Sequence, residues 1–109
     1  MTDTHTYWAT IGRNVNLGGP PLLSTEWEAF RTRLRNDVTV ACGGEILSSI
    51  VGRSSWDGEE EETYALLFTI GADYVAPLRH RLSGLARTYH QDAIGFVGGH
   101  GTDTLVEAS

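Results

Sequence analysis

The chain has 109 residues, 40% of them hydrophobic, and a single cysteine, Cys42. This length fits one compact domain spanning residues 1–109, which can bury a core without disulfides or a structural metal. One thiol excludes an intrachain disulfide and a multi-thiolate zinc site, and it is typical of a reducing compartment. The apolar runs are far shorter than the roughly 20 residues of a membrane span, and the N-terminus lacks the regions of a secretory signal. We therefore expect a cytoplasmic protein that does not enter the membrane.

The charge is negative and unevenly distributed. Acidic residues number 14 against 8 basic ones, all arginine, for a net charge of -6. Non-specific nucleic-acid binding depends on cationic side chains that displace counterions from phosphates. Because acidic residues predominate here, we do not expect this protein to bind nucleic acid non-specifically. Five acids gather within residues 57–62, whereas six of the arginines fall in two segments that read as helices. The molecule should therefore be dipolar.

The first half of the chain predicts a strand, a loop and a helix. Residues 5–12 mix aromatic and β-branched residues and end at glycine, as a strand does, and residues 14–21 are rich in Asn, Gly and Pro, as a loop is. Trp27, Phe30 and Leu34 recur at helical spacing. Thr25 and Glu28 form a capping box, so we expect a helix from about Thr25 to Asn36. Residues 38–42 fit either a brief strand or an extended exit from this helix.

The second half predicts a hairpin, a helix and a further strand. Strands over residues 46–56 and 63–70 should pair across the acidic turn, and the nearly continuous apolar character of the later strand predicts a central position. Apolar residues spaced by three and four predict a helix over about 74–90, with Asp73 as cap and Pro77 in its first turn. A strand over 93–97 follows, with a possible short return at 104–106. Residues 1–4 and about 103–109 are expected to be flexible ends.

This order, β-α-β-β-α-β, predicts an α+β, ferredoxin-like split β-α-β fold with two helices on one face of an antiparallel sheet. The opposite face is then left bare. Side chains alternate along a strand, which places Trp8 and Leu67 on that bare face. Exposed apolar patches often mark interfaces, so we expect self-association as a homodimer.

Four short pieces of sequence carry a resemblance. They are Ala9-Thr10-Ile11-Gly12-Arg13-Asn14-Val15, the helix bearing Trp27 and Phe30, Trp56-Asp57-Gly58-Glu59-Glu60, and Gln91-Asp92-Ala93-Ile94. Over about residues 6–97 the chain resembles small, mostly uncharacterised proteins of actinobacterial phages and their hosts. The resemblance implies a phage or mobile-element origin, in which small acidic ferredoxin-like proteins act by binding and blocking host factors. It carries over no catalytic residues.

Two glycine-rich segments are candidates for binding a small ligand. Arg13, Asn14 and Asn16 precede the first predicted helix, whose N-terminal amides and dipole favour anions such as phosphate or carboxylate. Alternatively, the asparagines adopt turn geometry and Arg13 pairs with a glutamate. His100 lies in a Gly-Gly-His-Gly tip and is a second candidate ligand-binding residue. That tip lacks the Lys and Ser or Thr of a phosphate-binding loop and also fits a plain turn.

The acidic run is the main candidate for binding a partner. Such a run is compatible with binding of divalent cations, with binding to a basic groove on a target, and with simple exposure to solvent. If the target is a protein, the predicted contact residues are Trp8, Trp56, Asp57, Glu59, Glu60, Glu61 and Glu62. No metal site is expected from the histidines, because a spacing of ten residues turns His80 and His90 about 80° apart on a helix.

The leading hypothesis is a non-enzymatic binding protein of phage type that inhibits or sequesters a host component, such as part of a defence system. The alternative is a small-molecule or nucleotide binder with its site at a dimer seam. A third possibility is a small ferredoxin-like enzyme that uses His100 or His90 as acid-base residue. The expected partners are thus a host protein or a small anionic ligand, with no cofactor, no metal and no assigned catalytic residue.

Overall fold

The computed structural model describes residues 3–16, 18–56, 58–98 and 103–108. Its elements, in chain order, are β1 (Thr4–Gly12), α1 (Ser24–Asn36), the π-helical turn η1 (Asp37–Ala41), β2 (Glu45–Trp56), β3 (Glu59–Gly71), the 3-10 turn η2 (Ala72–Tyr74), α2 (Val75–Thr88), β4 (Ala93–Gly98) and β5 (Asp103–Glu107).

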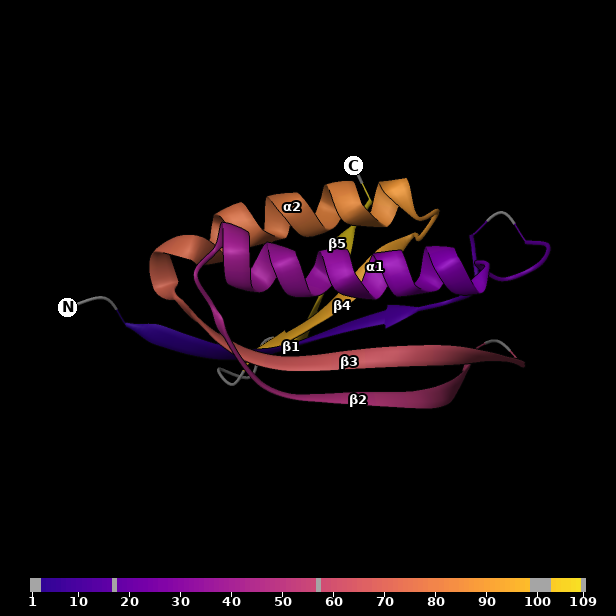
Figure 1. Cartoon of the computed structure of the whole chain (residues 1–109), viewed down its shortest axis with the longest axis horizontal. Helices are drawn as coiled ribbons and strands as arrows, with labels where there is room; N and C mark the ends of the chain where they lie inside the picture. The colour runs from indigo at the N-terminus through magenta and orange to yellow at the C-terminus, as the bar shows by residue number, and fades with distance from the viewer. Residues whose placement is uncertain (1–2, 17, 57, 99–102, 109) are drawn as a thin grey trace.

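The strands form one antiparallel sheet in the order β2-β3-β1-β4-β5. Both helices lie on the same side of this sheet, so its other face carries no helix (Figure 1). The predicted α+β, ferredoxin-like arrangement is confirmed, with β5 added beside β4. As predicted, the strand after the acidic run lies inside the sheet, between β2 and β1.

The core lies between the helices and the sheet. Alternate residues of β1 and β3 face the helices, and three regularly spaced residues of each helix meet them. The buried side chains of these four elements include Ala9, Ile11, Tyr64, Leu66, Phe68, Ile70, Trp27, Phe30, Leu34, Leu78, Leu82 and Leu85. Each large apolar side chain buried here contributes about 1.5–3 kcal/mol relative to an exposed one, so this layer stabilises the fold.

Residues 38–42 form neither a strand nor an extended exit, so both interpretations were wrong. Residues 37–41 form η1, which continues the helix of α1. Val38 is fully buried, and the Thr39 hydroxyl donates to the Arg35 carbonyl at 2.8 Å. Gly43 ends the turn with a φ of 65°, a backbone conformation that glycine adopts without steric cost. Burial of Val38 therefore outweighs the strand propensity of this β-branched stretch.

The first helix begins earlier than Thr25, at Ser24. The Leu23 amide donates to Glu26 Oε1 at 2.9 Å, so Glu26 rather than Glu28 caps the helix. The cause is tertiary: Leu22 is buried, and its amide donates to the Arg13 carbonyl at 2.9 Å. These contacts fix the chain just before the helix.

Both ends that were expected to be flexible contribute described residues to the sheet, and the possible short strand at 104–106 is confirmed as part of β5. Thr4 already pairs with Gly71, and residues 103–107 form β5 alongside β4. Val106 is buried, and the Ala108 amide donates to the Asp92 carbonyl at 2.9 Å. Without β5, the outer edge of β4 would leave backbone groups unpaired, which explains the gain from this added strand.

Within the described ranges, no helix is both long and apolar enough to cross a membrane.

Candidate functional site

Three connections that are far apart in sequence meet at one end of the sheet. They are the β1–α1 loop, the β2–β3 hairpin and the α2–β4 connection, which gather at the right-hand end of Figure 1. The backbone N–H of Asn14 donates to Glu61 Oε2 at 3.0 Å, and the backbone N–H of Asn16 donates to the His90 carbonyl at 2.8 Å. The Gln91 side chain donates to the Asn14 carbonyl at 2.8 Å. The β1–α1 loop is therefore held between the other two connections.

Four glutamates of the acidic run are strand residues at the start of β3, where Glu59 and Glu60 are exposed beside the hairpin turn. Glu59, Glu60, Glu61 and Glu62 belong to β3 and pair with residues 53–56 of β2. Because side chains alternate along a strand, the run is divided between the two faces. Glu60 and Glu62 point to the helix face, where they meet arginines. Glu59 and Glu61 lie on the bare face.

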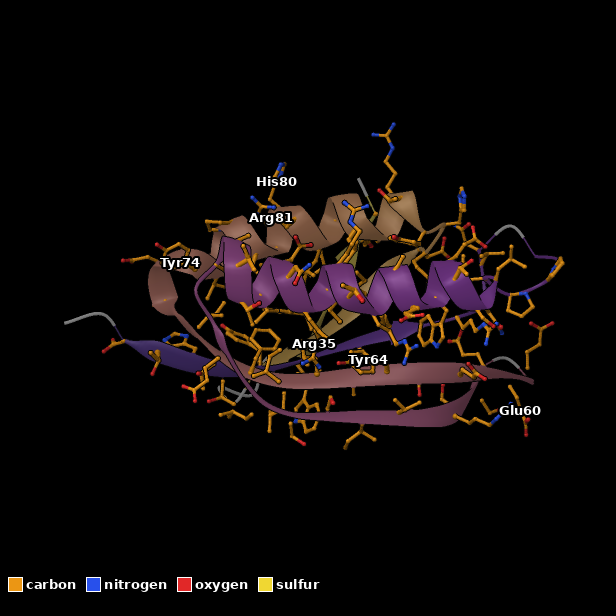
Figure 2. The ribbon with its side chains drawn as sticks, in the orientation of Figure 1. Arg35, Glu60, Tyr64, Tyr74, His80 and Arg81 are labelled. Atoms are coloured by element: carbon orange, nitrogen blue, oxygen red, sulfur yellow. The ribbon has the colours of Figure 1, made fainter. Side chains whose placement is uncertain are left out.

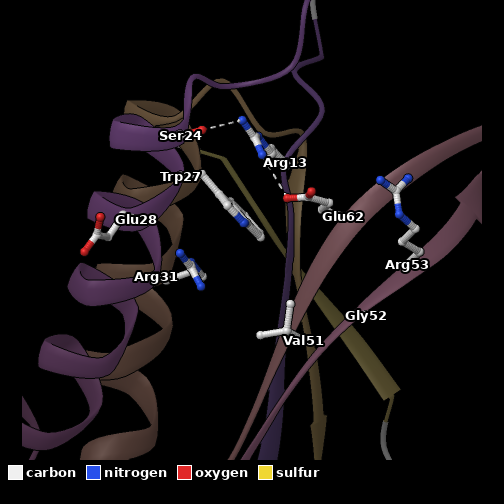
Figure 3. A pocket seen from close by; sticks show the side chains of 9 residues that line it. All are labelled: Arg13, Ser24, Trp27, Glu28, Arg31, Val51, Gly52, Arg53 and Glu62. Carbon is white, nitrogen blue, oxygen red and sulfur yellow. Dashed lines mark hydrogen bonds and ion pairs between the residues drawn. The ribbon is translucent and has the colours of Figure 1, made fainter.

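The first of two grooves at this end is the helix-face groove, a space of about 490 Å³ between α1 and the strands. Figure 3 shows Trp27 and Arg31 reaching from α1 toward Val51 of β2, with Arg13 and Glu62 at one end. Its lining residues are Arg13, Ser24, Trp27, Glu28, Arg31, Val51, Gly52, Arg53 and Glu62.

Arg13 is engaged within the protein. It donates to Glu62 Oε2 at 2.9 Å, to the Leu22 carbonyl at 2.7 Å and to the Ser24 hydroxyl at 3.3 Å. The hydrogen bond from Arg13 is the main cause of a lowered pKa of the Glu62 carboxyl. Of the two predicted roles of Arg13, the structure shows the ion pair with a glutamate. Its role as an anion ligand stays a prediction.

The second is the sheet-face groove, a space of about 440 Å³ on the bare face. Gly52, Thr63 and Gly12 lie in one row across β2, β3 and β1, and Thr10 pairs with Gly95 in the direction of β4. Small side chains in these rows leave the face hollow at this end. The lining residues are Thr10, Ile11, Gly12, Asn14, Val15, Asn16, Ser54, Glu59, Glu61, Thr63, Gln91, Asp92, Ala93 and Gly95.

The walls of the sheet-face groove are acidic and amide-bearing. Carboxylates come from Glu59, Glu61 and Asp92, and the lining contains no arginine. The predicted ligand residues Asn14 and Asn16 both lie here. The side-chain nitrogen of Asn16, Nδ2, donates to Asp92 Oδ1 at 3.1 Å. The groove therefore favours a cationic or hydrogen-bonding ligand over the predicted anion.

Sequence reasoning did not identify Gln91 as a site residue. Gln91 is buried, and its side-chain amide bridges the Asn14 and Tyr89 carbonyls at 2.8 and 3.2 Å. A buried amide needs such partners, because an unpaired polar group in the interior costs free energy. The only signal was a glutamine placed between a helix and a strand, which by itself does not distinguish a buried residue from an exposed one.

The remaining predicted residues lie elsewhere or outside the described ranges. Asp57 and His100 fall outside them, and for Trp56 only the backbone, in β2, is described. Trp8 is half-buried on the bare face, between Leu67 of β3 and Val97 of β4.

None of the histidines belongs to a metal-binding cluster in the part of the chain that the structure describes. His80 projects from the outer side of α2 (Figure 2), and His90 follows that helix with a φ of 58°.

An apolar strip adjoins the sheet-face groove along the bare face. Trp8 pairs with Leu67 and Val97, and Ile50 pairs with Ala65 in the neighbouring row. Ile50 and Val97 are 54% and 38% exposed. The prediction that Trp8 and Leu67 lie on the face of the sheet without helices is confirmed.

Together, these features define a small α+β protein of ferredoxin-like arrangement whose bare sheet face is hollowed at one end. Among solved structures it is similar to a phage SAM lyase in the apo state, with a TM-score of 0.56 and 13% identity over 96% of this chain and 90% of that one. The phage SAM lyase in complex with S-methyl-5'-thioadenosine gives a TM-score of 0.56 and 11% identity with the same coverage. No protein-family model and no curated protein matches the chain. At these identities the likeness shows the fold alone.

Proposed function

We propose that this protein binds a small adenosine-derived sulfur ligand, of the class of S-adenosylmethionine and S-methyl-5'-thioadenosine, in the sheet-face groove. The observation that carries the proposal is a groove of ligand size that holds three carboxylates and no arginine in its lining. Its volume of about 440 Å³ lies in the range of small-molecule sites. The likeness in fold to a protein solved with S-methyl-5'-thioadenosine supports the choice of ligand.

Charge favours the sulfonium form of such a ligand. S-adenosylmethionine carries a sulfonium, an ammonium and a carboxylate group and is positive overall, whereas S-methyl-5'-thioadenosine is neutral. A carboxylate about 4 Å from a cation contributes about 1 kcal/mol in water and more where water is excluded. Glu59, Glu61 and Asp92 therefore favour the charged ligand over the neutral one.

The groove also offers the groups that a nucleoside requires. The side chains of Asn14 and Asn16 can each present both an amide N–H and a carbonyl oxygen. Gly12 and Gly95 belong to the groove lining, where the Glu61 carboxylate lies over Gly12 and Thr10 lies over Gly95. A largely small-residue floor with a few convergent polar groups is typical of small-molecule sites.

A calorimetric titration tests the proposal, with S-adenosylmethionine and S-methyl-5'-thioadenosine titrated separately. Glu59→Gln removes one charge from the groove wall and keeps the side-chain shape. We expect about fivefold weaker binding of S-adenosylmethionine, since about 1 kcal/mol is lost, and little change for the neutral ligand. Mass spectrometry of the same mixtures detects any conversion of S-adenosylmethionine to the thioether.

The matched control is Glu45→Gln, the same substitution at an exposed position at the opposite end of β2, outside the groove lining. Failure of both ligands to bind the wild-type protein would contradict the proposal. An equal loss of binding in Glu45→Gln and Glu59→Gln would contradict the assignment of the groove.

A second candidate function, binding of a protein partner, is favoured by the apolar strip beside the groove. Trp8, Leu67, Val97 and Ile50 form a surface suited to a host protein or to a second copy of the chain. In the first case the protein would act as the predicted inhibitor; in the second the groove would lie beside a homodimer seam. Native mass spectrometry of the protein purified gently from a lysate separates these cases, and a clean monomer contradicts both.

A further inference from the structure

We propose that the helix-face groove is a second binding site, which takes an oxyanion, the phosphate or carboxylate group of a small ligand, on Arg31 and Arg53. This site lies on the opposite side of the sheet from the sheet-face groove. Binding at this site is therefore independent of binding at the proposed nucleoside site.

Arg31 carries the argument because it forms no ion pair with a carboxylate among the residues described. Its guanidinium lies over the Trp27 ring at 5.6 Å from the ring centroid. Its Nε atom is buried and has no hydrogen-bond partner among the residues that the structure describes. A buried donor without a partner costs about 1–3 kcal/mol, more when the donor is charged. An oxyanion in the groove would provide an acceptor for this guanidinium, which belongs to the groove lining.

Arg53 supplies a second cation from the opposite wall. Within the described ranges its one ion pair is with Glu60, at 3.5 Å, and both side chains are mostly exposed. Exposed pairs of this kind are worth little, so Arg53 can exchange Glu60 for a ligand at small cost. Arg13 differs, because its three donor groups already serve Glu62, Leu22 and Ser24.

The lining of this groove carries more cationic than anionic side chains, although the chain has a net charge of -6. Three guanidinium groups line it against the carboxylates of Glu28 and Glu62. The pKa of Glu62 is lowered first by the hydrogen bond from Arg13, and the charges of Arg53 and Arg31 also act in that direction. Ser24 places the N-terminus of α1 at the same site, and the helix dipole adds partial positive charge there.

Guanidinium geometry decides the class of ligand. Its planar array of donors matches phosphate and carboxylate oxygens, often through two parallel hydrogen bonds. The groove holds about 490 Å³, enough for a small organic molecule that carries such a group. A neutral nucleoside has no charge for this site to recognise.

The experiment is an NMR titration of the full chain at constant ionic strength, with inorganic phosphate in one arm and acetate in the other. The observed signals are the Arg31 Nε–H and the Trp27 indole N–H. We expect a saturable shift of both signals. Saturation by phosphate alone assigns the site to phosphorylated ligands, saturation by acetate alone to carboxylates, and saturation by both to either oxyanion; each of these outcomes supports the proposal.

Variants make the test specific. Arg31→Gln keeps most of the side-chain length and should weaken binding about tenfold, since a charge-assisted hydrogen bond is lost. Arg53→Gln, at an exposed strand position, should weaken it about threefold and serves if the first variant does not fold. The control is Arg87→Gln, an exposed arginine near the end of α2 that lies outside the groove lining.

Absence of saturation in the wild-type protein in both arms would overturn the proposal. So would equal affinity in wild type, Arg31→Gln and Arg53→Gln. Titration of Arg31→Gln with S-methyl-5'-thioadenosine separates the two sites, because that ligand carries neither a phosphate nor a carboxylate and should bind this variant as it binds the wild type.

Discussion

The two grooves share β3 but are opposite in charge and in construction. On the helix face, Glu60 and Glu62 are neutralised by Arg53 and Arg13. On the bare face, Glu59 and Glu61 line a groove whose lining contains no arginine. A single acidic run thus serves two surfaces because the strand turns alternate side chains to opposite sides. A cluster of charge in a sequence is one site only if its backbone places it on one face.

Their walls differ in what they contribute to stability. The helix-face groove is walled by Trp27, which is 3% exposed and packs edge-on against Phe30 at 6.0 Å. The sheet-face groove is walled by a loop and by strand residues in contact with solvent. Substitutions on the helix face should therefore affect folding and binding together, whereas those on the bare face should affect binding with less effect on folding.

The largest effect expected from this contrast is that of Trp27→Ala. Removal of a buried tryptophan from the core costs about 3–5 kcal/mol, a large share of the 5–15 kcal/mol that holds a typical domain. Chemical denaturation measures the change. Ile50→Ala is the counterpart on the bare face and should cost less than about 1 kcal/mol, since Ile50 is 54% exposed.

Ile50→Ala also tests whether the bare face is covered in solution. If a second copy lies on the apolar strip, the cost of this substitution should rise with protein concentration, since association stabilises the folded state by mass action. Equal losses for Trp27→Ala and Ile50→Ala in a protein that stays monomeric would contradict the contrast between the two walls.

Gly12→Ala should have a smaller effect, confined to the sheet-face groove. A Cβ at this position would meet the Glu61 carboxylate, which would have to move away from the Asn14 amide. Loss of that hydrogen bond and the resulting crowding should cost about 1–2 kcal/mol. Binding of S-adenosylmethionine should weaken as well, as measured by calorimetry.

Gly52→Ala is the matched control, because Gly52 lies in the same row of the sheet. A Cβ there would find only Thr63 Oγ1, at an ordinary contact distance of 3.8 Å. Its stability should stay within about 0.5 kcal/mol of the wild type. An equal effect of the two substitutions would mean that the position of the Glu61 carboxylate does not matter.

The smallest effect concerns the pH dependence conferred by Glu62. Its pKa is lowered in the folded protein, so its contribution to stability is present above the ordinary glutamate pKa and is lost as the pH falls through the lowered value. Glu62→Gln should therefore lower stability at neutral pH and converge with the wild type in acid. Denaturation curves across this pH range measure it, and a difference that persists in acid would argue against the ion pair with Arg13.

Much of the fold could be predicted because its signals are local. The spacing of Trp27, Phe30 and Leu34 indicated α1, and the alternation around Trp8 placed that residue on the bare face. The errors arose where distant contacts decide the outcome. Residues 38–42 have strand-like composition, yet the burial of Val38 makes them helical. The tail expected to be flexible from about 103 forms β5 because the edge of β4 is available for pairing, as the predicted short strand at 104–106 had indicated.

For the candidate sites, the sequence by itself determined the chemical groups: an acidic run, a glycine- and asparagine-rich loop, and an excess of arginine in the helices. Only the tertiary structure decided which of these groups meet. Hydrogen bonds between residues 47 and 77 positions apart bring Asn14 to Glu61 and to Gln91. The pleat of β3 then divides its glutamates between two grooves. Such pairings depend on strand register and loop closure, which no local pattern encodes, because each is fixed by packing across the whole sheet.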